Sequence, residues 1–328
     1  MTTTLNVEPT TRNSEPRTSK LEQRTPVHVL LALLLVSAPA LLAQSNAFQF
    51  VVSVVDESGR PVSDLTRDEI VLTENGIADE IVKVEPFAIP IELTLAVDNG
   101  PLSADSLVHY RNGLSGLVKA LPGDVEVTLI TMSPQPLMVV RPTTDRIRVL
   151  RGLTTFAPQD DSPRFTDTLV EFAKRYEEEL QRTRKIDSVP VLVMISTSVT
   201  EAVSYQPPEI TRALGFLERR KAIVHVAMLN INRGATGLAS LDDGRQTLIA
   251  IPATKVTRGR YESLANPSRL TTLLPELGTQ LASLHRKQVN QLLVTANRRP
   301  GLRGQLQNAQ IGLTRKNLKG SVSLDGLP

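Results

Sequence analysis

Histidines and one serine are the residues whose types could support acid–base or nucleophilic chemistry. His28, His109, His225 and His285 are far apart in the chain, and none has a metal-binding spacing such as His-x-x-x-His. Ser115 lies in the segment GLSG (113–116), but a nucleophile elbow needs its serine at a strand-to-helix turn, and this segment predicts the middle of a helix. The sequence therefore predicts no catalytic residue, and we expect a protein that is not an enzyme.

The histidines also have expected structural positions. His225 lies inside the apolar run IVHVAML, so we expect a core or strand-end residue with a hydrogen-bonded ring, and we expect His109 and His285 at the surface. Gly234–Gly237 lacks the strand-turn-helix context of a phosphate or dinucleotide site. A hydrolase with an unrecognised arrangement of residues stays open as an alternative.

Composition excludes several classes of site and partner. The chain has 328 residues and no cysteine, so it has neither disulfides nor thiolate metal sites. Its 37 basic and 34 acidic residues nearly balance, which argues against nucleic acid as a partner. Aromatic residues make up only 3% of the chain, so stacking platforms are absent. Another protein is the expected partner.

Residues 1–43 are predicted to be a signal peptide with a long polar leader. Arg17, Lys20 and Arg24 precede an apolar stretch from Val27 to Ala43, and small residues near its end offer cleavage points. The alternative is an uncleaved membrane anchor, although the run is shorter than the roughly 20 residues that span a bilayer. Either way we expect an exported protein, periplasmic or extracellular.

The pattern after residue 43 changes twice. Residues 44–88 contain short β-rich runs separated by turns and predict a small β-module. Residues 89–287 alternate apolar strands, such as 91–97 and 189–195, with amphipathic helices. This predicts an α/β domain with a doubly wound, mainly parallel sheet that has helices on both faces. Ligands in such sheets bind at the carboxyl ends of the strands.

Residues 288–328 predict a C-terminal tail of β-strands. From His285 onward the chain has eight basic residues and only one acidic residue, Asp325. This asymmetry fits either an acidic partner or the solvated, charged edge of terminal strands. The basic residues are Arg286, Lys287, Arg298, Arg299, Arg303, Arg315, Lys316 and Lys319.

Several segments resemble the exported von Willebrand factor type A (VWFA) proteins that are common in Acidobacteria. In the leading part, LTRDEI (65–70) and ENG (74–76) match the family's "Leu-Thr-x-x-(Asp/Glu)-Phe" step and acidic turn. In the α/β part, the matching segments are IELTLAVDNG (91–100), VPVLVMISTS (189–198) and residues 257–283. The resemblance extends from about residue 50 to residue 296 and implies a VWFA/Rossmann-like fold.

The resemblance also implies a metal-ion-dependent adhesion site, which is degenerate here. The family has Asp-x-Ser-x-Ser after the first strand of the α/β domain, a threonine in a second loop and an aspartate after a later strand. This chain keeps Asp98, but Gly100 and Leu102 replace the serines and Thr197 replaces the second carboxylate. Mg²⁺ requires several oxygen ligands, so we expect weak binding at most.

Two interpretations of Asp98 follow. We favour a turn and cap residue, because Asp-Asn-Gly-Pro is a strong turn signal. The alternative is a metal-dependent adhesin that binds Mg²⁺ or Mn²⁺ at a rebuilt site of Asp98 with Thr166 or Thr168. In either case we expect a protein-binding surface at the strand ends, formed by Asp98, Asn99, Ser103, Asp105, Asp160, Asp161, Thr166, Thr168, Ser196 and Thr197.

Overall fold

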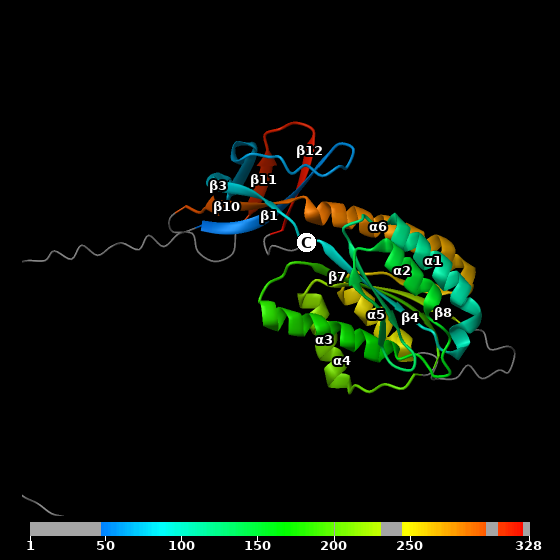
Figure 1. Cartoon of the computed structure of the whole chain (residues 1–328). Coiled ribbons are helices and arrows are strands. Elements are labelled where there is room, and N and C mark those ends of the chain that lie inside the picture. The colour runs from blue at the N-terminus through cyan, green and yellow to red at the C-terminus, as the bar shows by residue number, and fades with distance from the viewer. Residues whose placement is uncertain (1–46, 200, 231–244, 300–307, 324–328) are drawn as a thin grey trace, which may run out of the picture. The chain divides into compact units, whose positions relative to one another are not determined.

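The computed structural model describes residues 47–199, 201–230, 245–299 and 308–323. The predicted signal peptide, the segment Gly234–Gly237 and Arg303 lie outside the described residues. The described chain forms one mainly parallel sheet and one antiparallel sheet (Figure 1).

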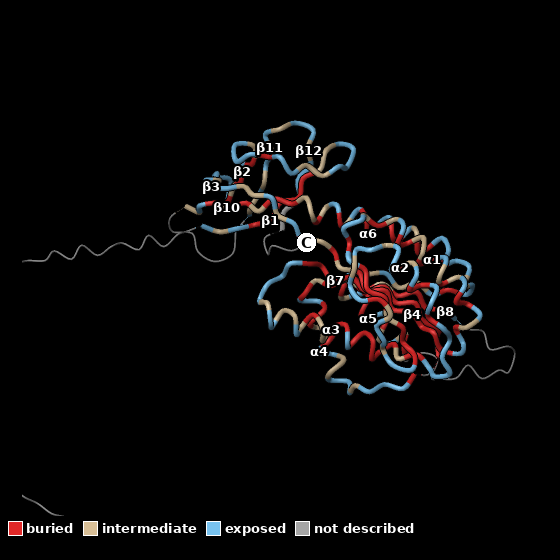
Figure 2. The backbone as a smooth tube through the Cα atoms, in the orientation of Figure 1, coloured by how far each residue is buried: buried red, intermediate tan, exposed pale blue. Residues whose placement is uncertain are grey.

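The mainly parallel sheet has the strand order β6-β5-β4-β7-β8-β9, in which only β6 runs antiparallel to its neighbour. Strands covered on both faces need apolar residues at successive positions. All nine residues of β7 are accordingly buried, and Figure 2 shows the strands of this sheet as mostly buried. The strands are β4 (Ile91–Val97), β5 (Glu126–Thr131), β6 (Leu137–Thr143), β7 (Val189–Thr197), β8 (Ile223–Leu229) and β9 (Tyr261–Leu264).

Helices cover both faces of this sheet (Figure 1). Successive residues of β4 alternate between two separate core clusters, so that Leu95 packs with α1, α2 and α6 and Ala96 packs with α3, α4 and α5. This confirms the predicted doubly wound α/β fold. The helices are α1 (Leu107–Ala120), α2 (Arg146–Thr155), α3 (Phe165–Thr183), α4 (Pro207–Arg219), α5 (Arg245–Val256) and α6 (Leu270–Val289).

Two glycines let α1 and α6 approach closely. A Cβ atom on Gly113 would lie 2.5 Å from the carbonyl oxygen of Leu270, and one on Gly278 would lie 2.7 Å from that of Leu117. A larger residue at either position would push the helices apart. Helix packing therefore explains Gly113 in the segment GLSG, and Ser115 of that segment lies inside α1, as predicted.

The antiparallel sheet combines strands from before and after the α/β domain, in the order β11-β2-β3-β10-β1-β12. Residues 44–88 and 288–328, which the sequence pattern divided into two separate parts, therefore contribute to one sheet. The physical reason is that the leading strands bury Phe50 and Leu72 only together with tail residues such as Leu292. The strands are β1 (Ala47–Asp56), β2 (Ile70–Glu74), β3 (Ile77–Phe87), β10 (Gln291–Asn297), β11 (Ala309–Leu313) and β12 (Leu318–Ser323).

Arginines of the tail pair with carboxylates of the leading strands. The Nε of Arg298 donates to Oε2 of the fully buried Glu74 at 2.7 Å. The Nε of Arg315 donates to Oε1 of Glu69 at 2.7 Å, and hydrogen bonds from Arg315, followed by those from Thr66, lower the pKa of Glu69 to about 2. Part of the basic tail thus stabilises its own sheet, whereas Lys316 is exposed.

Two elements were not predicted, namely α5 and β9. In α5 the pattern is irregular, because Pro252 interrupts it and Leu248 is exposed while the small Ala250 and Ala253 are buried. α3 also begins at Phe165, three residues before the predicted start. Within the described ranges, no helix has an apolar stretch long enough to cross a bilayer.

Candidate functional site

The candidate site lies at the carboxyl edge of the mainly parallel sheet. Asp98 directly follows β4, and Thr197 ends the neighbouring strand β7. Val97 is opposite Ile195 in the sheet, and the N–H of Asp98 donates to the carbonyl oxygen of Ile195 at 2.8 Å. The register of these two strands therefore brings Asp98 and Thr197 together.

Protein hydrogen bonds satisfy both carboxylate oxygens of the completely buried Asp98. Oδ2 accepts the backbone N–H of Thr197 at 2.9 Å and also accepts the Thr197 hydroxyl. Oδ1 accepts the N–H of Gly100 at 2.7 Å. Burial raises the pKa of Asp98, and these hydrogen bonds counteract the rise. Asp98 is thus a hydrogen-bonded link between the ends of β4 and β7.

Thr166, in the first turn of α3, binds a different carboxylate. Glu201 accepts the backbone N–H of Thr166 at 2.9 Å and its hydroxyl at 2.5 Å, and so it caps the N-terminus of α3. Burial raises the pKa of Glu201. The hydroxyl of Thr168 donates to the carbonyl oxygen of Arg164 at 2.7 Å. The two threonines therefore have partners other than Asp98.

A neighbouring loop occupies the space that a side chain at position 100 would need. A Cβ atom on Gly100 would lie only 2.9 Å from the carbonyl oxygen of Asp161. Asn99 holds this loop through two hydrogen bonds. Its side-chain Nδ2 donates to the carbonyl oxygen of Ala157 at 2.9 Å, and its backbone carbonyl oxygen accepts the N–H of Gln159 at 2.7 Å. The hydroxyl that the family places at this position has no room here.

This arrangement does not fit a divalent cation. Mg²⁺ requires near-octahedral coordination by oxygen ligands. Both oxygens of Asp98 accept hydrogen bonds from the protein, and the Thr166 hydroxyl donates to Glu201. Across the described parts of the chain, no group of three or more Asp, Glu or His side chains is arranged to hold a metal.

Most of the residues predicted to form the binding surface are buried. The accessible ones are Asp105, Asp160 and Asp161. Two apolar residues of the same loops, Leu102 and Val203, are each 39% exposed. The sequence did not single them out, because an isolated apolar residue in a loop has no sequence signature. Glu201 was also not predicted, because a single acidic residue in a loop has no sequence signature either. The buried residues are Asp98, Asn99, Ser103, Thr166, Thr168, Ser196 and Thr197.

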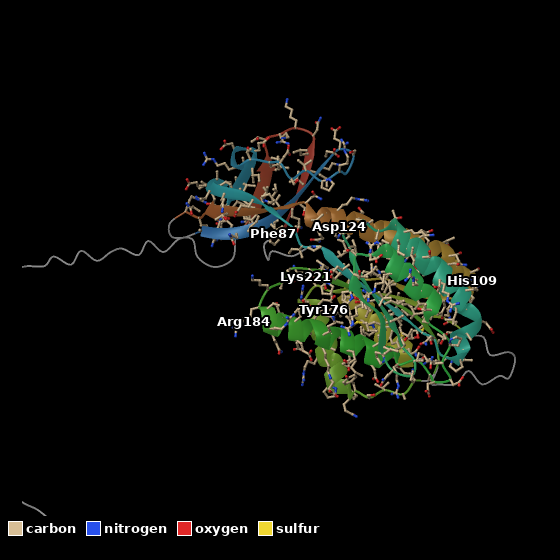
Figure 3. All side chains as sticks on the ribbon, in the orientation of Figure 1. Phe87, His109, Asp124, Tyr176, Arg184 and Lys221 are labelled. Carbon is tan, nitrogen blue, oxygen red and sulfur yellow. The ribbon has the colours of Figure 1, made fainter. Side chains whose placement is uncertain are left out.

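His285 is buried, with 1% exposure, so the predicted surface position is wrong. The leucine-rich face of α6 that packs on the sheet also carries this histidine into the core. Its Nε2 lies 3.0 Å from Oδ2 of Asp124, which is labelled in Figure 3, and its Nδ1 accepts the N–H of Ile91 at 3.3 Å. Both ring nitrogens have partners, so this Asp–His pair has no nitrogen left to activate a nucleophile.

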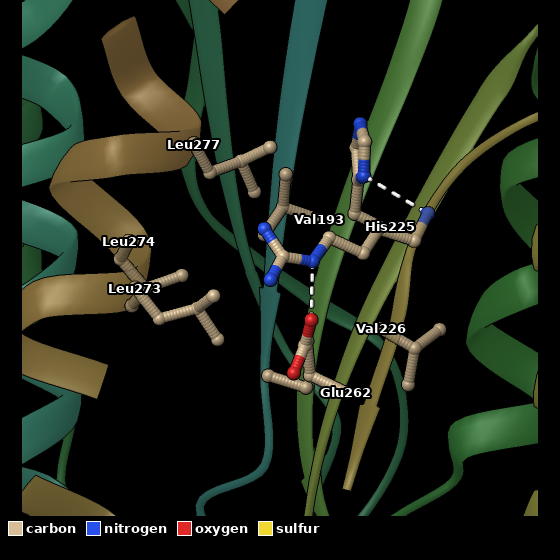
Figure 4. Close-up of a pocket in the computed structure, with 9 residues that line it drawn as sticks. Val193, His225, Val226, Glu262, Leu273, Leu274 and Leu277 are labelled. Atoms are coloured by element: carbon tan, nitrogen blue, oxygen red, sulfur yellow. Dashed lines mark hydrogen bonds and ion pairs between the residues drawn. The ribbon is translucent and has the colours of Figure 1, made fainter. Parts of the chain in front are cut away.

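His225 lines a narrow cavity between α6 and strands β8 and β9 (Figure 4). Its Nδ1 accepts the N–H of Arg260 at 3.1 Å, in agreement with a strand residue whose ring is hydrogen-bonded. Burial, and then the charge of Arg260, lower the pKa of His225 to about 4. The rest of the lining contains no serine or threonine. It consists of the Arg260–Glu262 ion pair and of the apolar side chains of Val193, Val226, Ala227, Leu273, Leu274 and Leu277.

Comparison with solved structures finds several that are similar to this chain. BatB from Bacteroides thetaiotaomicron is 14% identical, and the match covers 58% of this chain and 98% of BatB, with a TM-score of 0.43. A von Willebrand factor type A protein from Catenulispora acidiphila is 8% identical, with 86% and 74% covered and a TM-score of 0.46. Manganese-loaded TRAP from Plasmodium vivax is 15% identical, with 75% and 99% covered and a TM-score of 0.45. No family model and no curated protein matches the sequence.

Proposed function

We propose that this chain, whose α/β domain is of the VWA type, is an exported protein-binding module that works without a metal ion and is not an enzyme. The observation that carries this proposal is that Thr197 and Gly100 together satisfy the carboxylate of Asp98. This supports the proposal, because protein groups alone donate to both carboxylate oxygens and join the ends of β4 and β7. The loops at this edge are where open α/β sheets bind their ligands.

The proposed binding surface consists of exposed side chains above these buried links. Leu102 and Val203 offer apolar contact area, and Asp105, Asp160 and Asp161 offer hydrogen-bond acceptors. The buried links beneath hold the loops in one conformation, which reduces the entropy lost on binding. Another protein is the partner that suits a mixed apolar and polar surface of this kind.

The positions of the histidines support a non-enzymatic function. His285 uses both ring nitrogens in structural contacts. His225 accepts a backbone N–H, and its cavity lining contains no nucleophilic hydroxyl. Neither residue has the nucleophile–base geometry that acyl transfer or hydrolysis requires.

Export is proposed from the sequence of residues 27–43, which lie outside the described residues. N-terminal sequencing of the protein from the cell envelope tests this step. We expect the mature chain to begin shortly after Ala38, Ala40 or Ala43. Recovery of the full-length chain from the cytoplasm alone contradicts export.

Site-specific photo-crosslinking in the producing cells tests the binding surface. With a photoreactive amino acid in place of Leu102 or Val203, we expect the same protein adduct from both positions, and we expect it to form equally well with EDTA. The control position is Arg212, which is exposed on α4. Loss of the adduct with EDTA favours the metal-dependent adhesin, and equal adducts at Arg212 contradict a specific surface.

A further inference from the structure

The outer edge of β6 is open to an added strand. β6 is the last strand of its sheet and pairs only with β5 among the described residues. The strand at the opposite edge, β9, has four residues, whereas β6 has seven. An edge strand presents unpaired backbone N–H and C=O groups, and proteins usually protect it with charges or by shortening it. β6 carries a charge and a proline, Arg141 and Pro142, only in its second half, and neither feature occurs between Leu137 and Val140.

Apolar side chains are exposed at this edge. Leu137 is 56% exposed and Met138 is 43% exposed, both on β6. α2 follows β6 in the chain and packs on β5 and β6, and its residue Ile147 is 71% exposed. Leu137 and Met138 are successive residues of β6, so their side chains point to opposite faces of the sheet and offer apolar contacts on both sides of the strand edge.

Three arginines without salt bridges to described residues lie on β6 and α2. The side chains of Arg141 on β6 and of Arg148 and Arg151 on α2 are exposed, and none forms a salt bridge with a described residue. Asp145 is the carboxylate that precedes α2, but it accepts the backbone N–H groups of Ile147 and Arg148 as the helix cap. The surface therefore combines apolar side chains with uncompensated positive charge.

We propose that the β6 edge and the outward side of α2 bind an extended segment of another protein that carries both apolar and acidic side chains. The segment adds as a further strand to the first half of β6, before Pro142, which has no N–H to donate, and forms backbone hydrogen bonds along that open edge. Strand addition takes its affinity from the main chain and its specificity from alternate side chains. Carboxylates of the segment pair with Arg141, Arg148 and Arg151. This site does not use the loops around Asp98.

The test uses the full chain and fluorescent eight-residue peptides in anisotropy titrations. The first peptide alternates valine and glutamate, the second replaces glutamate by lysine, and the third is the first peptide with every second backbone amide N-methylated. We expect saturable binding of the first peptide, and we expect the other two peptides to bind at least about tenfold more weakly than the first. Absence of saturable binding by the first peptide, or equal affinities for all three, overturns the proposal.

Variants of exposed arginines separate this surface from non-specific charge effects. We expect Arg148→Glu/Arg151→Glu to weaken binding of the valine–glutamate peptide by about tenfold, since two exposed ion pairs are lost. The matched control is Arg212→Glu/Arg219→Glu, which also reverses two exposed charges, on α4 on the other face of the sheet, and should leave the affinity unchanged. Because all four positions are exposed, these variants should fold. Equal effects at α2 and α4 overturn the proposal.

Discussion

Thr197 donates both its backbone N–H and its side-chain hydroxyl to one carboxylate oxygen of Asp98, across the neighbouring strands β7 and β4. In the family that this chain resembles, two of the residues that surround a metal ion stand at the positions of Asp98 and Thr197. In this chain the two residues bind each other directly. The link joins two strand ends that are completely buried, so its loss should affect stability as well as the loops above it.

Thr197→Val removes the hydroxyl donor and keeps the size of the side chain. We expect the free energy of unfolding to fall by about 1–3 kcal/mol, because a buried carboxylate loses a hydrogen bond. Urea denaturation measures the change. The control is Thr211→Val on α4, where the hydroxyl donates to the carbonyl oxygen of Pro207 at an exposed position, and there we expect a change within about 0.5 kcal/mol. Equal losses in both variants contradict the proposed link.

Regular periodicity allowed most of the fold to be predicted. The apolar runs at 91–97 and 189–195 predict buried strands, which correspond to β4 and β7, and the helix predicted at 107–121 corresponds closely to α1. The pairing of the leading strands with the tail was not predictable, because strand partners far apart in the chain leave no local pattern. α5 was missed because its buried positions hold alanines and its exposed ones hold Leu248 and Ile251.

The candidate site was predictable in its position but not in its chemistry. The resemblance pointed to Asp98, to Thr166 or Thr168, and to Thr197, and the structure places Asp98 beside Thr197. The partner of Thr166 is Glu201, whose role depends on how the loop after β7 folds back onto α3. The burial of His285 was also unpredictable from charge and polarity alone, because it depends on which face of α6 packs on the sheet.

Restoring both serines of the family motif should not restore a metal site. In Gly100→Ser/Leu102→Ser, the new Cβ at position 100 meets the carbonyl oxygen of Asp161 at 2.9 Å. We expect no calorimetric heat of Mn²⁺ binding, and a loss of about 1–3 kcal/mol in stability from overpacking. Gly123→Ser is the control, because a Cβ there has no neighbour within 4 Å. Micromolar Mn²⁺ binding by the double variant contradicts this account.

Glu201→Ala should destabilise the start of α3. The substitution leaves the N–H and the hydroxyl of the buried Thr166 without an acceptor, so we expect a loss of about 2–3 kcal/mol in the free energy of unfolding. Glu209→Ala is the matched control, since Glu209 accepts the N–H of Gln206 in an exposed cap of α4, and there we expect about 0.5–1 kcal/mol. A loss at Glu201 no larger than at Glu209 is the contradicting result.

His225 should make stability depend on pH. Its pKa is about 4 in the folded chain, against 6.5 as the ordinary value. Between these values the unfolded chain binds more protons, so stability is complete above about pH 6.5 and falls as the pH decreases to about 4, by up to about 3 kcal/mol. Urea titrations of His225→Gln should lack this contribution, whereas His109→Gln should keep it. The same pH dependence in both variants contradicts the assignment.

Electron paramagnetic resonance of free Mn²⁺ tests the central claim most directly, because protein-bound Mn²⁺ loses the sharp six-line signal of the hydrated ion. Mn²⁺ is titrated into the mature chain and into Asp98→Ala. The account predicts that both proteins leave the six-line signal at its buffer intensity. Loss of one equivalent of the signal with the wild-type chain, and its recovery in Asp98→Ala, would show a metal site at Asp98 and contradict the account.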